Sequence, residues 1–403
     1  MSEQIDSNRI AARLSRISES ETIAMAKLGR ALAASGKDVV NLSFGEPDFF
    51  TPQHIKQAGI DAINNNQTFY TPVAGIIELR EAIKVKFKRD NNLDYDVNEI
   101  VVSTGAKHSI MNVVLALVNP GEEVVIPQPY WVSYSEMVNM AEGVNVFIPS
   151  SIETNYKISA QQLEDAITPN TKLFMFSSPN NPSGMSYTEN ELKAFVEVFE
   201  RNPHVYVLSD EIYEHINYQD KHYSIANYGT MRNRTITVNG VSKAFSMTGW
   251  RIGYIGAPKD IAYACEKLQS QFTSGTNSIA QRASIASLLG TMQPTFDMVS
   301  AFQKRRDLCY DALKNINGLK IIKPTSAFYL FPDIGFFKGK SFGNYHIKTS
   351  QDLCMYFLNE YFVVVVAGSA FGNDNCIRLS FATNEENLLK AMARIKDGLD
   401  KLV

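Results

Sequence analysis

Short apolar runs alternate with longer helix-like segments through the first two thirds of this 403-residue chain. Strands that are buried on both faces read as continuous apolar runs, whereas half-exposed strands alternate between apolar and polar residues. Strands separated by helices form parallel sheets. The pattern therefore predicts an α/β fold with a mainly parallel central sheet covered by helices. The expected strands are residues 99–104, 122–127, 144–149, 172–178, 205–210, 235–240 and 253–258, and the expected helices include 106–118, 130–142 and 188–202.

The pattern changes beyond about residue 290. A long amphipathic stretch at 295–316 precedes several short apolar runs, and a charged helical tail begins at Asn384. This arrangement is typical of a smaller α+β domain. The first 48 residues are too few to bury a core alone, so we expect them to pack with it. We predict a large domain over residues 49–290 and a small domain made of residues 1–48 and 291–403.

Charge and composition narrow the class of partner. The chain carries 39 basic and 42 acidic residues, interspersed, for a formal net charge of -3. It lacks the basic face that binds nucleic acid or a membrane surface, so we expect a small-molecule substrate. The amino terminus has no signal-peptide core, and no stretch reaches the roughly 18 apolar residues of a membrane span. These features favour a cytoplasmic location.

The four cysteines, Cys265, Cys309, Cys354 and Cys376, are widely scattered. Zinc sites and disulfide frameworks have characteristic cysteine spacings. These four cysteines form no CxxC pair and stand near no histidine cluster. We therefore expect reduced core cysteines and no metal site. The chain also lacks the GxSxG, SxxK and HExxH motifs, which disfavours serine-hydrolase and zinc-peptidase chemistry.

A lysine among small residues stands near the centre of the segment VNGVSKAFSMTGWRIG, residues 238–253. Lys243 follows an apolar run and precedes Arg251 by eight residues. An amine becomes nucleophilic where burial or a nearby cation disfavours its ammonium form. Lys243 is thus a candidate to react with an aldehyde cofactor whose phosphate Arg251 holds. The alternative is a solvated surface lysine, which is the commoner situation for a lysine judged alone.

Polar residues also end two other apolar runs. Asp210 closes the run 205–210, Tyr213 follows it, and Asn181 lies in the turn SSPNNPSG. A carboxylate beside a pyridine nitrogen keeps that nitrogen protonated, and open α/β sheets bind ligands at the carboxyl ends of their strands. Each residue has a structural alternative, because Asp is a common helix N-cap and Asn, Pro, Ser and Gly are common in plain turns.

Three further positions are candidates for binding. Gly105, in STGAKHSI, marks a strand-to-helix junction whose backbone NH groups favour a phosphate, although the chain has neither a dinucleotide fingerprint nor a P-loop there. Trp131 follows a strand end and is suited to stack on a flat ring, or else belongs to the core. Arg378 is a charge inside an apolar run, where a buried cation normally needs a carboxylate partner.

Taken together and in this order, these motifs resemble the pyridoxal 5′-phosphate (PLP) enzymes of fold type I, specifically class I aminotransferases of the bacterial aspartate aminotransferase type. SPNNPSG, SDEIYEH and SKAFSMTGWRIGY follow PYWVSY in the family's order. The similarity extends from LSFGEPDFFTP at Leu42 to IRLSFAT at Ile377. The resemblance implies a large PLP-binding domain, with helices on both faces of its sheet, plus a smaller α+β domain.

The resemblance also implies a role for each matching residue. Lys243 is expected to form a Schiff base with PLP and to move a proton between the substrate's α-carbon and the cofactor's C4′ atom. Asp210 is expected to pair with the ring nitrogen and Trp131 to stack on the ring. Asn181 and Tyr213 are expected to hydrogen-bond the ring's 3′-oxygen. The remaining predicted cofactor contacts, mostly to the phosphate, are Gly105, Ala106, Lys107, Ser242, Arg251 and, from the second subunit of a homodimer, Tyr70.

The substrate contacts follow from the same resemblance. Arg378 matches the family's clamp on the substrate's α-carboxylate, because a planar guanidinium binds a carboxylate through two hydrogen bonds. Gly45, Trp131 and Asn181 are expected to assist it. The distal carboxylate of an acidic substrate is expected to meet Lys107, Ser20 and Thr22, although Lys107 has the alternative of a surface lysine at a helix start.

The resemblance implies an aspartate aminotransferase that transfers the amino group of L-aspartate to 2-oxoglutarate by a ping-pong route through the pyridoxamine form. Prephenate, aromatic or alanine transamination and a PLP-dependent carbon–sulfur lyase remain alternatives, because the cofactor contacts do not read the substrate's side chain. Three positions depart from the family pattern: Ala367 where proline is usual, Ser326 where glycine is usual, and Gly240 where some relatives carry serine.

Overall fold

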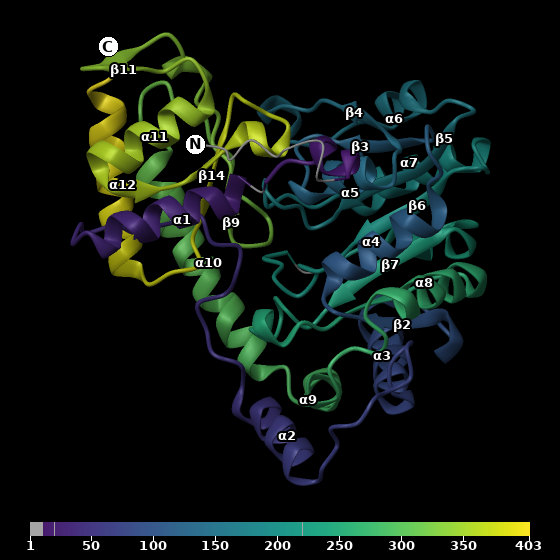
Figure 1. Ribbon diagram of the computed structural model, residues 1–403. Helices are drawn as coiled ribbons and strands as arrows, with labels where there is room; N and C mark the ends of the chain where they lie inside the picture. Colours follow the sequence, from purple (N-terminus) through teal and green to yellow (C-terminus); the bar gives the residue numbers. More distant parts are fainter. Residues whose placement is uncertain (1–10, 20, 220) are drawn as a thin grey trace.

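A computed structural model of the protein describes residues 11–19, 21–219 and 221–403. Its centre is a seven-stranded sheet in the order β2-β8-β7-β6-β5-β3-β4 (Figure 1). The sheet confirms all seven strands that the apolar runs predict. They are β2 (Ile100–Ser103), β3 (Glu123–Pro127), β4 (Val144–Ile148), β5 (Thr171–Ser177), β6 (Tyr206–Asp210), β7 (Thr235–Gly240) and β8 (Gly253–Gly256).

The sheet is mainly parallel, as expected. Strand β8 runs antiparallel to both of its neighbours, β2 and β7, and the other neighbouring pairs are parallel. A parallel strand would need a crossover of about a dozen residues or more, usually through an α-helix. The segment between β7 and β8 contains Lys243 and only one short 3₁₀ helix, so it returns the chain directly beside β7.

Helices cover both faces of the sheet because successive strand residues point to opposite sides. In β5, Leu173 and Met175 pack with α4, α5 and α8, whereas Phe174 and Phe176 pack on the opposite face with α7. Helices α3 and α9 form a third cluster around β2. The helices of this part are α2 (Gln53–Asn64), α3 (Ile77–Asn91), α4 (Ala106–Leu117), α5 (Ser133–Met140), α6 (Ala160–Ala166), α7 (Glu189–Arg201), α8 (Lys259–Phe272) and α9 (Ser278–Leu289).

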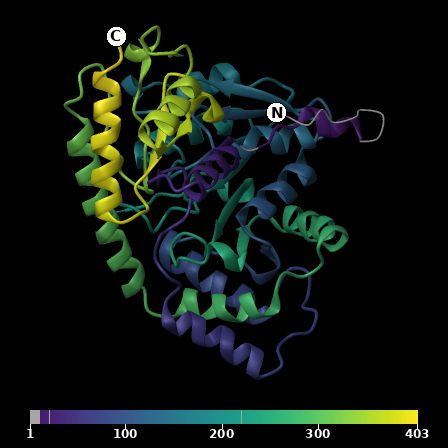
Figure 2. The same cartoon turned by 60° about the vertical axis from the view of Figure 1, so that its left-hand side comes forward.

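The carboxyl-terminal part forms a second core beside the sheet, and the amino-terminal helix α1 joins it (Figures 1 and 2). Strand β1 pairs in parallel with β12, so a segment near the amino terminus is joined to the carboxyl-terminal part. A three-stranded sheet in the order β13-β14-β9 lies in the same part. Its principal elements are α1 (Glu21–Ala34), β1 (Val40–Asn41), α10 (Gln293–Leu313), β9 (Tyr329–Leu330), α11 (Ser350–Tyr361), β12 (Val363–Val364), β13 (Val366–Ala367), β14 (Ile377–Ser380) and α12 (Glu385–Asp400).

Two glycines allow close backbone contacts at the ends of β7 and β8, one of them with the start of α4. A Cβ atom on Gly253 would lie 2.1 Å from the backbone nitrogen of Ala106, and a Cβ on Gly240 would lie 2.8 Å from the carbonyl oxygen of Ile252. Both distances are far below van der Waals contact. The departure from serine at Gly240 therefore has a steric reason in this chain.

All four cysteines are free and buried, which confirms that they are core residues. Among the helices of the described residues, none combines the length and apolar character that a membrane crossing requires.

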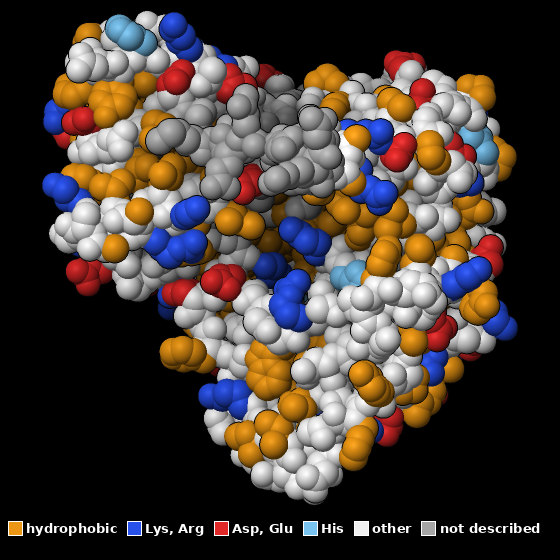
Figure 3. Space-filling model, viewed as in Figure 1, with side chains coloured by type: hydrophobic (Ala, Val, Ile, Leu, Met, Phe, Trp, Pro, Cys, Tyr) orange, Lys and Arg blue, Asp and Glu red, His pale blue; other side chains and the backbone are white. Residues whose placement is uncertain are grey.

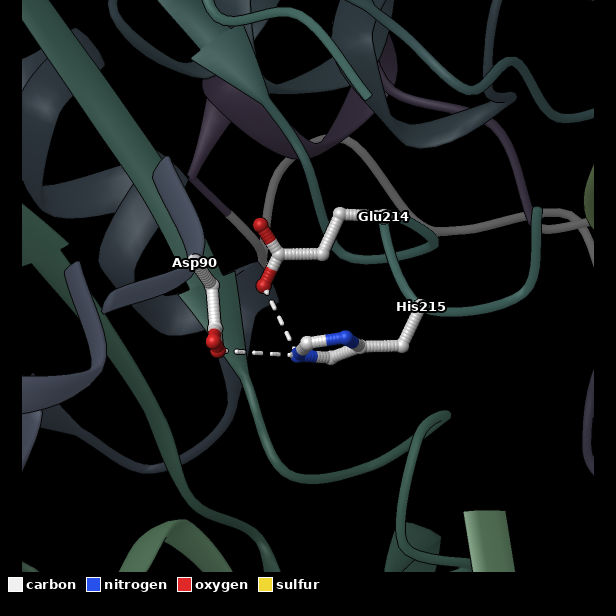
Figure 4. Close-up of side chains that lie close together, drawn as sticks. All are labelled: Asp90, Glu214 and His215. Atoms are coloured by element: carbon white, nitrogen blue, oxygen red, sulfur yellow. Dashed lines mark ion pairs between the residues drawn. The ribbon is translucent and has the colours of Figure 1, made fainter. Parts of the chain in front are cut away.

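A polar cluster lies between helix α3 and the turn that follows β6, and Figure 4 shows three of its side chains, Asp90, Glu214 and His215. The Lys86 ammonium group pairs with the Glu214 carboxylate and donates a hydrogen bond to Asn91 at 2.6 Å. The Nε2 atom of His215 lies 3.2 Å from Glu214 and 3.4 Å from Asp90. The carboxylate and imidazole atoms are close enough to share a metal ion, but the Lys86 cation already neutralises Glu214. The cluster ties helix α3 to the turn that follows β6.

Candidate active site

A cavity of about 330 Å³ lies where strands β5, β6 and β7 end. Open α/β sheets bind ligands at this edge. On the face seen in Figure 3, Lys and Arg side chains gather around a hollow near the middle of the molecule. The cavity brings together most of the residues predicted from the sequence: Thr22, Gly45, Ala106, Lys107, Trp131, Asn181, Asp210, Tyr213, Ser242, Lys243, Arg251 and Arg378.

Lys243 projects into this cavity from the turn after β7. Its Nζ atom donates a 2.5 Å hydrogen bond to the carbonyl oxygen of Gly45. Burial lowers the pKa of Lys243 to about 8, and although the Glu46 carboxylate opposes this shift, the nearby Arg251 and Arg378 cations add to it. A larger fraction of the side chain is therefore the free amine near neutral pH than for an ordinary lysine.

Asp210 is the last residue of β6 and is buried. Its carboxylate accepts hydrogen bonds from the hydroxyl of Tyr134 at 2.8 Å and from the backbone NH of Ile212 at 3.2 Å. Burial raises the pKa of Asp210 to about 6, although these two hydrogen bonds oppose the rise. Both donors are uncharged, so the carboxylate keeps its charge available for a cationic ligand group.

Arg378 occupies β14 with only 2% of its surface exposed. Its guanidinium donates to the side-chain oxygen of Asn181 at 3.0 Å and to the carbonyl oxygen of Ser43 at 2.7 Å, and its Nε atom has no hydrogen-bond partner. Within the described part of the chain, no carboxylate lies within ion-pair distance of Arg378. A buried cation without an anion costs free energy, so a carboxylate from a ligand would complete this site.

The start of helix α4 faces the same cavity. Gly105 adopts a φ of +83° as the N-cap, and Ala106 begins the helix. A Cβ atom on Gly105 would lie 2.4 Å from a terminal nitrogen of Arg251, so the guanidinium packs directly over the glycine. Helix amino termini and a neighbouring guanidinium both favour an anion. Ser242, which also lines the cavity, adds a hydroxyl.

Lys107 and Trp131 form one wall. The Nζ atom of Lys107 lies 5.0 Å from the centre of a Trp131 ring. Burial, together with the Arg251 cation, lowers the pKa of Lys107. Thr22, at the start of α1, lines the same cavity, whereas Ser20 lies outside the described residues.

Tyr70 lies outside this cavity. Its side chain is 99% exposed, and it borders a separate surface hollow with Thr68, Phe69 and Thr71. The adjacent Phe69 is exposed as well, at 82%. Within a single copy of the chain, Tyr70 therefore does not line the cavity that contains Lys243.

The sequence analysis missed two tyrosines of the site. Tyr134 donates to Asp210, and Tyr329 lines the cavity with its hydroxyl 2.7 Å from that of Tyr213. Tyr134 belongs to the motif PYWVSY, three residues after Trp131, and Tyr329 to the apolar run AFYLF. A buried tyrosine usually has a hydrogen-bond partner, so these two residues carried a signal, but the pattern did not identify the partner.

The family model for aminotransferases of class I and II matches residues 37–395. The chain belongs to this family. It is 46% identical over 390 residues to the probable aspartate/prephenate aminotransferase of Rhizobium leguminosarum bv. phaseoli, an alignment that covers 96% of this chain and 98% of the relative.

Two solved structures of aspartate aminotransferases are similar to this protein over nearly the whole chain. The aspartate aminotransferase of Rhizobium meliloti superposes with a TM-score of 0.94 at 43% identity, over 98% of this chain and 99% of that one. The aspartate aminotransferase of Thermus thermophilus with maleate gives a TM-score of 0.90 at 38% identity, over 96% of this chain and 99% of that one. The expected fold type I architecture is thereby confirmed.

Class I and II aminotransferases use PLP, so this protein is a PLP-dependent transaminase with small-molecule substrates. The donor set of the cavity fits that cofactor. It offers an amine of lowered pKa for an aldehyde, an unpaired buried carboxylate for a ring nitrogen, and a helix start with a guanidinium for a phosphate. The Nε atom of Arg378 has no hydrogen-bond partner among the described residues, so it can donate a hydrogen bond to a substrate carboxylate.

The raised pKa of Asp210 predicts that its ionised carboxylate lowers the stability of the cofactor-free protein, although the same charge is available to bind the cofactor. Folding favours the protonated carboxyl, so ionised Asp210 lowers stability as the pH rises from about 4 to 6, and the cost persists at higher pH. The substitution Asp210→Asn removes this cost. At pH 8, urea denaturation of the cofactor-free variant should give a free energy of unfolding about 2 to 3 kcal/mol above wild type.

If Asp210 pairs with the ring nitrogen, as the resemblance implies, the same variant should bind PLP more weakly, because that nitrogen loses its anionic partner. Asp165→Asn, which changes an exposed carboxylate on α6, is the matched control and should alter neither quantity. If cofactor-free Asp210→Asn proved less stable than wild type at pH 8, the attributed cost of burying Asp210 would be wrong.

Proposed function

We propose that this aminotransferase transfers the amino group of L-aspartate to 2-oxoglutarate by a ping-pong route through the pyridoxamine form of its cofactor. The observation that carries this proposal is the pair of cations, Arg378 and Lys107, that line one cavity. A dicarboxylic substrate has two anionic ends, and each cation suits one of them. The relatives named above as aspartate or aspartate/prephenate aminotransferases support the same substrate class.

In this proposal the cofactor is held through its ring and through its phosphate. Asp210 pairs with the ring nitrogen, Trp131 stacks on the ring, and Asn181 and Tyr213 hydrogen-bond its 3′-oxygen. The phosphate would be held by the backbone NH groups of Ala106 and Lys107 at the helix start that follows Gly105, by Ser242 and Arg251, and by Tyr70 from a second subunit. When bound, PLP supplies a ring that accepts the electron pair released when the substrate's α-carbon loses its proton.

The protein's own groups then position the substrate and move the proton. Arg378 binds the α-carboxylate through two hydrogen bonds, assisted by Asn181 and by the backbone at Gly45. Lys243 Nζ takes the proton from the α-carbon and returns it at the cofactor's C4′ atom. Its lowered pKa supports this role, because a general base works best when its pKa lies near the operating pH. Lys107 and Thr22 would bind the distal carboxylate. Ser20 is predicted from the sequence to do the same and lies outside the described residues.

We propose residues 49–290 as the large, cofactor-binding domain and residues 1–48 with 291–403 as the small domain. The pairing of β1 with β12 supports this division, as do the contacts of α1 with β12 and β13. Most of the proposed cofactor contacts then belong to the large domain, whereas Arg378, Gly45 and Thr22 belong to the small one. Substrate is thus bound by both domains.

We also propose a homodimer with shared active sites, located in the cytoplasm. The exposed side chains of Phe69 and Tyr70 support the dimer, because large aromatic residues at the surface are common in interfaces. A cytoplasmic location rests on the sequence alone and can be checked by cell fractionation.

The role of Lys243 is tested by the substitution Lys243→Ala. The variant should lose the pH-dependent visible absorbance of the bound cofactor, and kcat should fall by at least about 10³-fold, because the proton-moving group is gone. Lys193→Ala, on the exposed surface of α7, serves as the control and should leave both unchanged. Normal transamination by Lys243→Ala would sink the assignment.

Substrate choice is tested at Lys107. The substitution Lys107→Ala should raise KM for aspartate and glutamate by about 10- to 100-fold, the value of one charge-assisted hydrogen bond, and change KM for alanine and phenylalanine little. A panel scored by kcat/KM with 2-oxoglutarate as acceptor measures this. A second assay, with glutamate as the amino donor and prephenate as the acceptor, tests the other candidate suggested by the relatives' names. An equal effect on all substrates would remove Lys107 from the distal site.

The origin of Tyr70 is tested with a mixed dimer. One chain carries Lys243→Ala and the other carries Tyr70→Phe. If Tyr70 serves the neighbouring subunit, the site with intact Lys243 receives an intact Tyr70 and binds PLP as wild type does. The Tyr70→Phe homodimer should bind PLP about tenfold more weakly, because the phosphate loses one hydrogen bond. A mixed dimer as weak as that homodimer would place Tyr70 in its own subunit's site.

A further inference from the structure

Tyr329 contacts Tyr213 at the edge of the cavity. Their hydroxyl oxygens lie 2.7 Å apart, and their rings meet nearly at right angles with centres 5.8 Å apart. Both side chains are buried and both line the cavity. A tyrosine hydroxyl has one proton to donate and lone pairs with which to accept, so one of the two donates to the other.

Tyr329 also lies against the guanidinium of Arg378. Strand β9 pairs with β14 so that Tyr329 is opposite Ser380, which brings Arg378 to the same face of the sheet as a diagonal neighbour. The Arg378 Cζ atom lies 4.7 Å from the centre of the Tyr329 ring. Tyr329 is therefore the residue that links the buried cation to the hydroxyl of Tyr213.

The surroundings favour Tyr329 as the donor. Burial raises the pKa of Tyr329, and the Arg378 cation is the largest effect that opposes the rise. Burial also raises the pKa of Tyr213, well above its usual value; the neighbouring Tyr329 hydroxyl adds to the rise, and Arg378 opposes it. The Arg378 guanidinium lies against the ring of Tyr329, and a cation in contact with a tyrosine makes its hydroxyl the better donor. When Tyr329 donates, Tyr213 accepts and keeps its own proton free for a third group.

We propose that Tyr329 is a positioning residue for the cofactor: it donates a hydrogen bond to Tyr213 and so directs the Tyr213 proton toward the cofactor's 3′-oxygen. This inference rests on the role proposed above for Tyr213. A hydroxyl that accepts a hydrogen bond donates a stronger one, because the chain of bonds polarises itself. Tyr329 thus strengthens the hold of Tyr213 on the negative charge at that oxygen.

The substitution Tyr329→Phe tests the proposal, because it keeps the ring beside Arg378 and removes only the hydroxyl. The dissociation constant of PLP, measured by fluorescence titration of the cofactor-free protein, should rise about 2- to 10-fold, as for the loss of one hydrogen bond. The pH midpoint of the bound cofactor's visible absorbance should rise by about 0.3 to 0.5 units, because the negative 3′-oxygen loses stabilisation. Binding of succinate, a probe for the Arg378 site, should change less than about twofold, because the ring beside the guanidinium remains.

A double-substitution cycle distinguishes positioning from an independent effect. If Tyr329 acts through Tyr213, adding Tyr329→Phe to Tyr213→Phe should produce no further change in the dissociation constant or in the midpoint. Tyr95→Phe is the matched control, since Tyr95 is fully buried and its hydroxyl lies 3.0 Å from the Thr237 hydroxyl, away from the cavity residues. It should leave PLP binding and the midpoint unchanged while it affects thermal stability to a similar degree.

The outcomes separate this inference from the proposed function. If Tyr213→Phe moves the midpoint and Tyr329→Phe does not, the positioning role is overturned and the function stands. A further, equal shift in the Tyr213→Phe background would overturn it too, because the two tyrosines would then act separately. If Tyr213→Phe itself leaves PLP binding and the midpoint unchanged, the role proposed for Tyr213 fails, and the inference fails with it.

Discussion

A charge that is removed from water needs an ion-pair partner or hydrogen bonds that stabilise it. In the cavity of this protein, the buried charges of Arg378 and Asp210 have hydrogen bonds but, among the described residues, no ion-pair partner. Arg378 is buried, yet its hydrogen bonds go to an amide oxygen and a backbone carbonyl, which are neutral. Asp210 is buried, yet among the described residues it accepts hydrogen bonds only from a hydroxyl and a backbone NH. Neutral partners hold such a side chain in place without cancelling its charge. The cavity is thus polarised in advance for a ligand with matching charges.

The polar cluster between helix α3 and the turn after β6 differs from the cavity, because its charges are paired within the protein. There Lys86 pairs directly with Glu214, and Asn91 hydrogen-bonds to both of them. The charges cancel within the protein, so this cluster can contribute to holding the turn after β6 without attracting a ligand. The same turn carries Tyr213. One face of the turn is therefore closed by internal ion pairing, while the other faces a cavity whose charges remain open.

The sequence predicts the strands of this fold well because their physical signature is local. Strands buried on both faces need apolar residues at every position, and each such run marks its own strand. The order of the strands in the sheet and the antiparallel course of β8 depend on how distant segments pack, which no single run contains. The site follows the same rule. Charged residues at strand ends, such as Asp210 and Lys243, are conspicuous, whereas Tyr134 and Tyr329 look like core aromatics until their hydroxyl partners are known.

The separation of charges along the chain also explains why the chemistry of the site is easier to infer than its substrate. Asp210, Asn181 and Lys243 lie at or just beyond the carboxyl ends of β6, β5 and β7, so one edge of one sheet positions them together. Lys107 and Thr22 reach the same cavity from the starts of two different helices, α4 and α1. A substitution in either helix start can alter which side chain fits without disturbing the sheet edge. With the roles proposed for these residues, reaction type and substrate preference are carried by different elements, and a motif that identifies the first says little about the second.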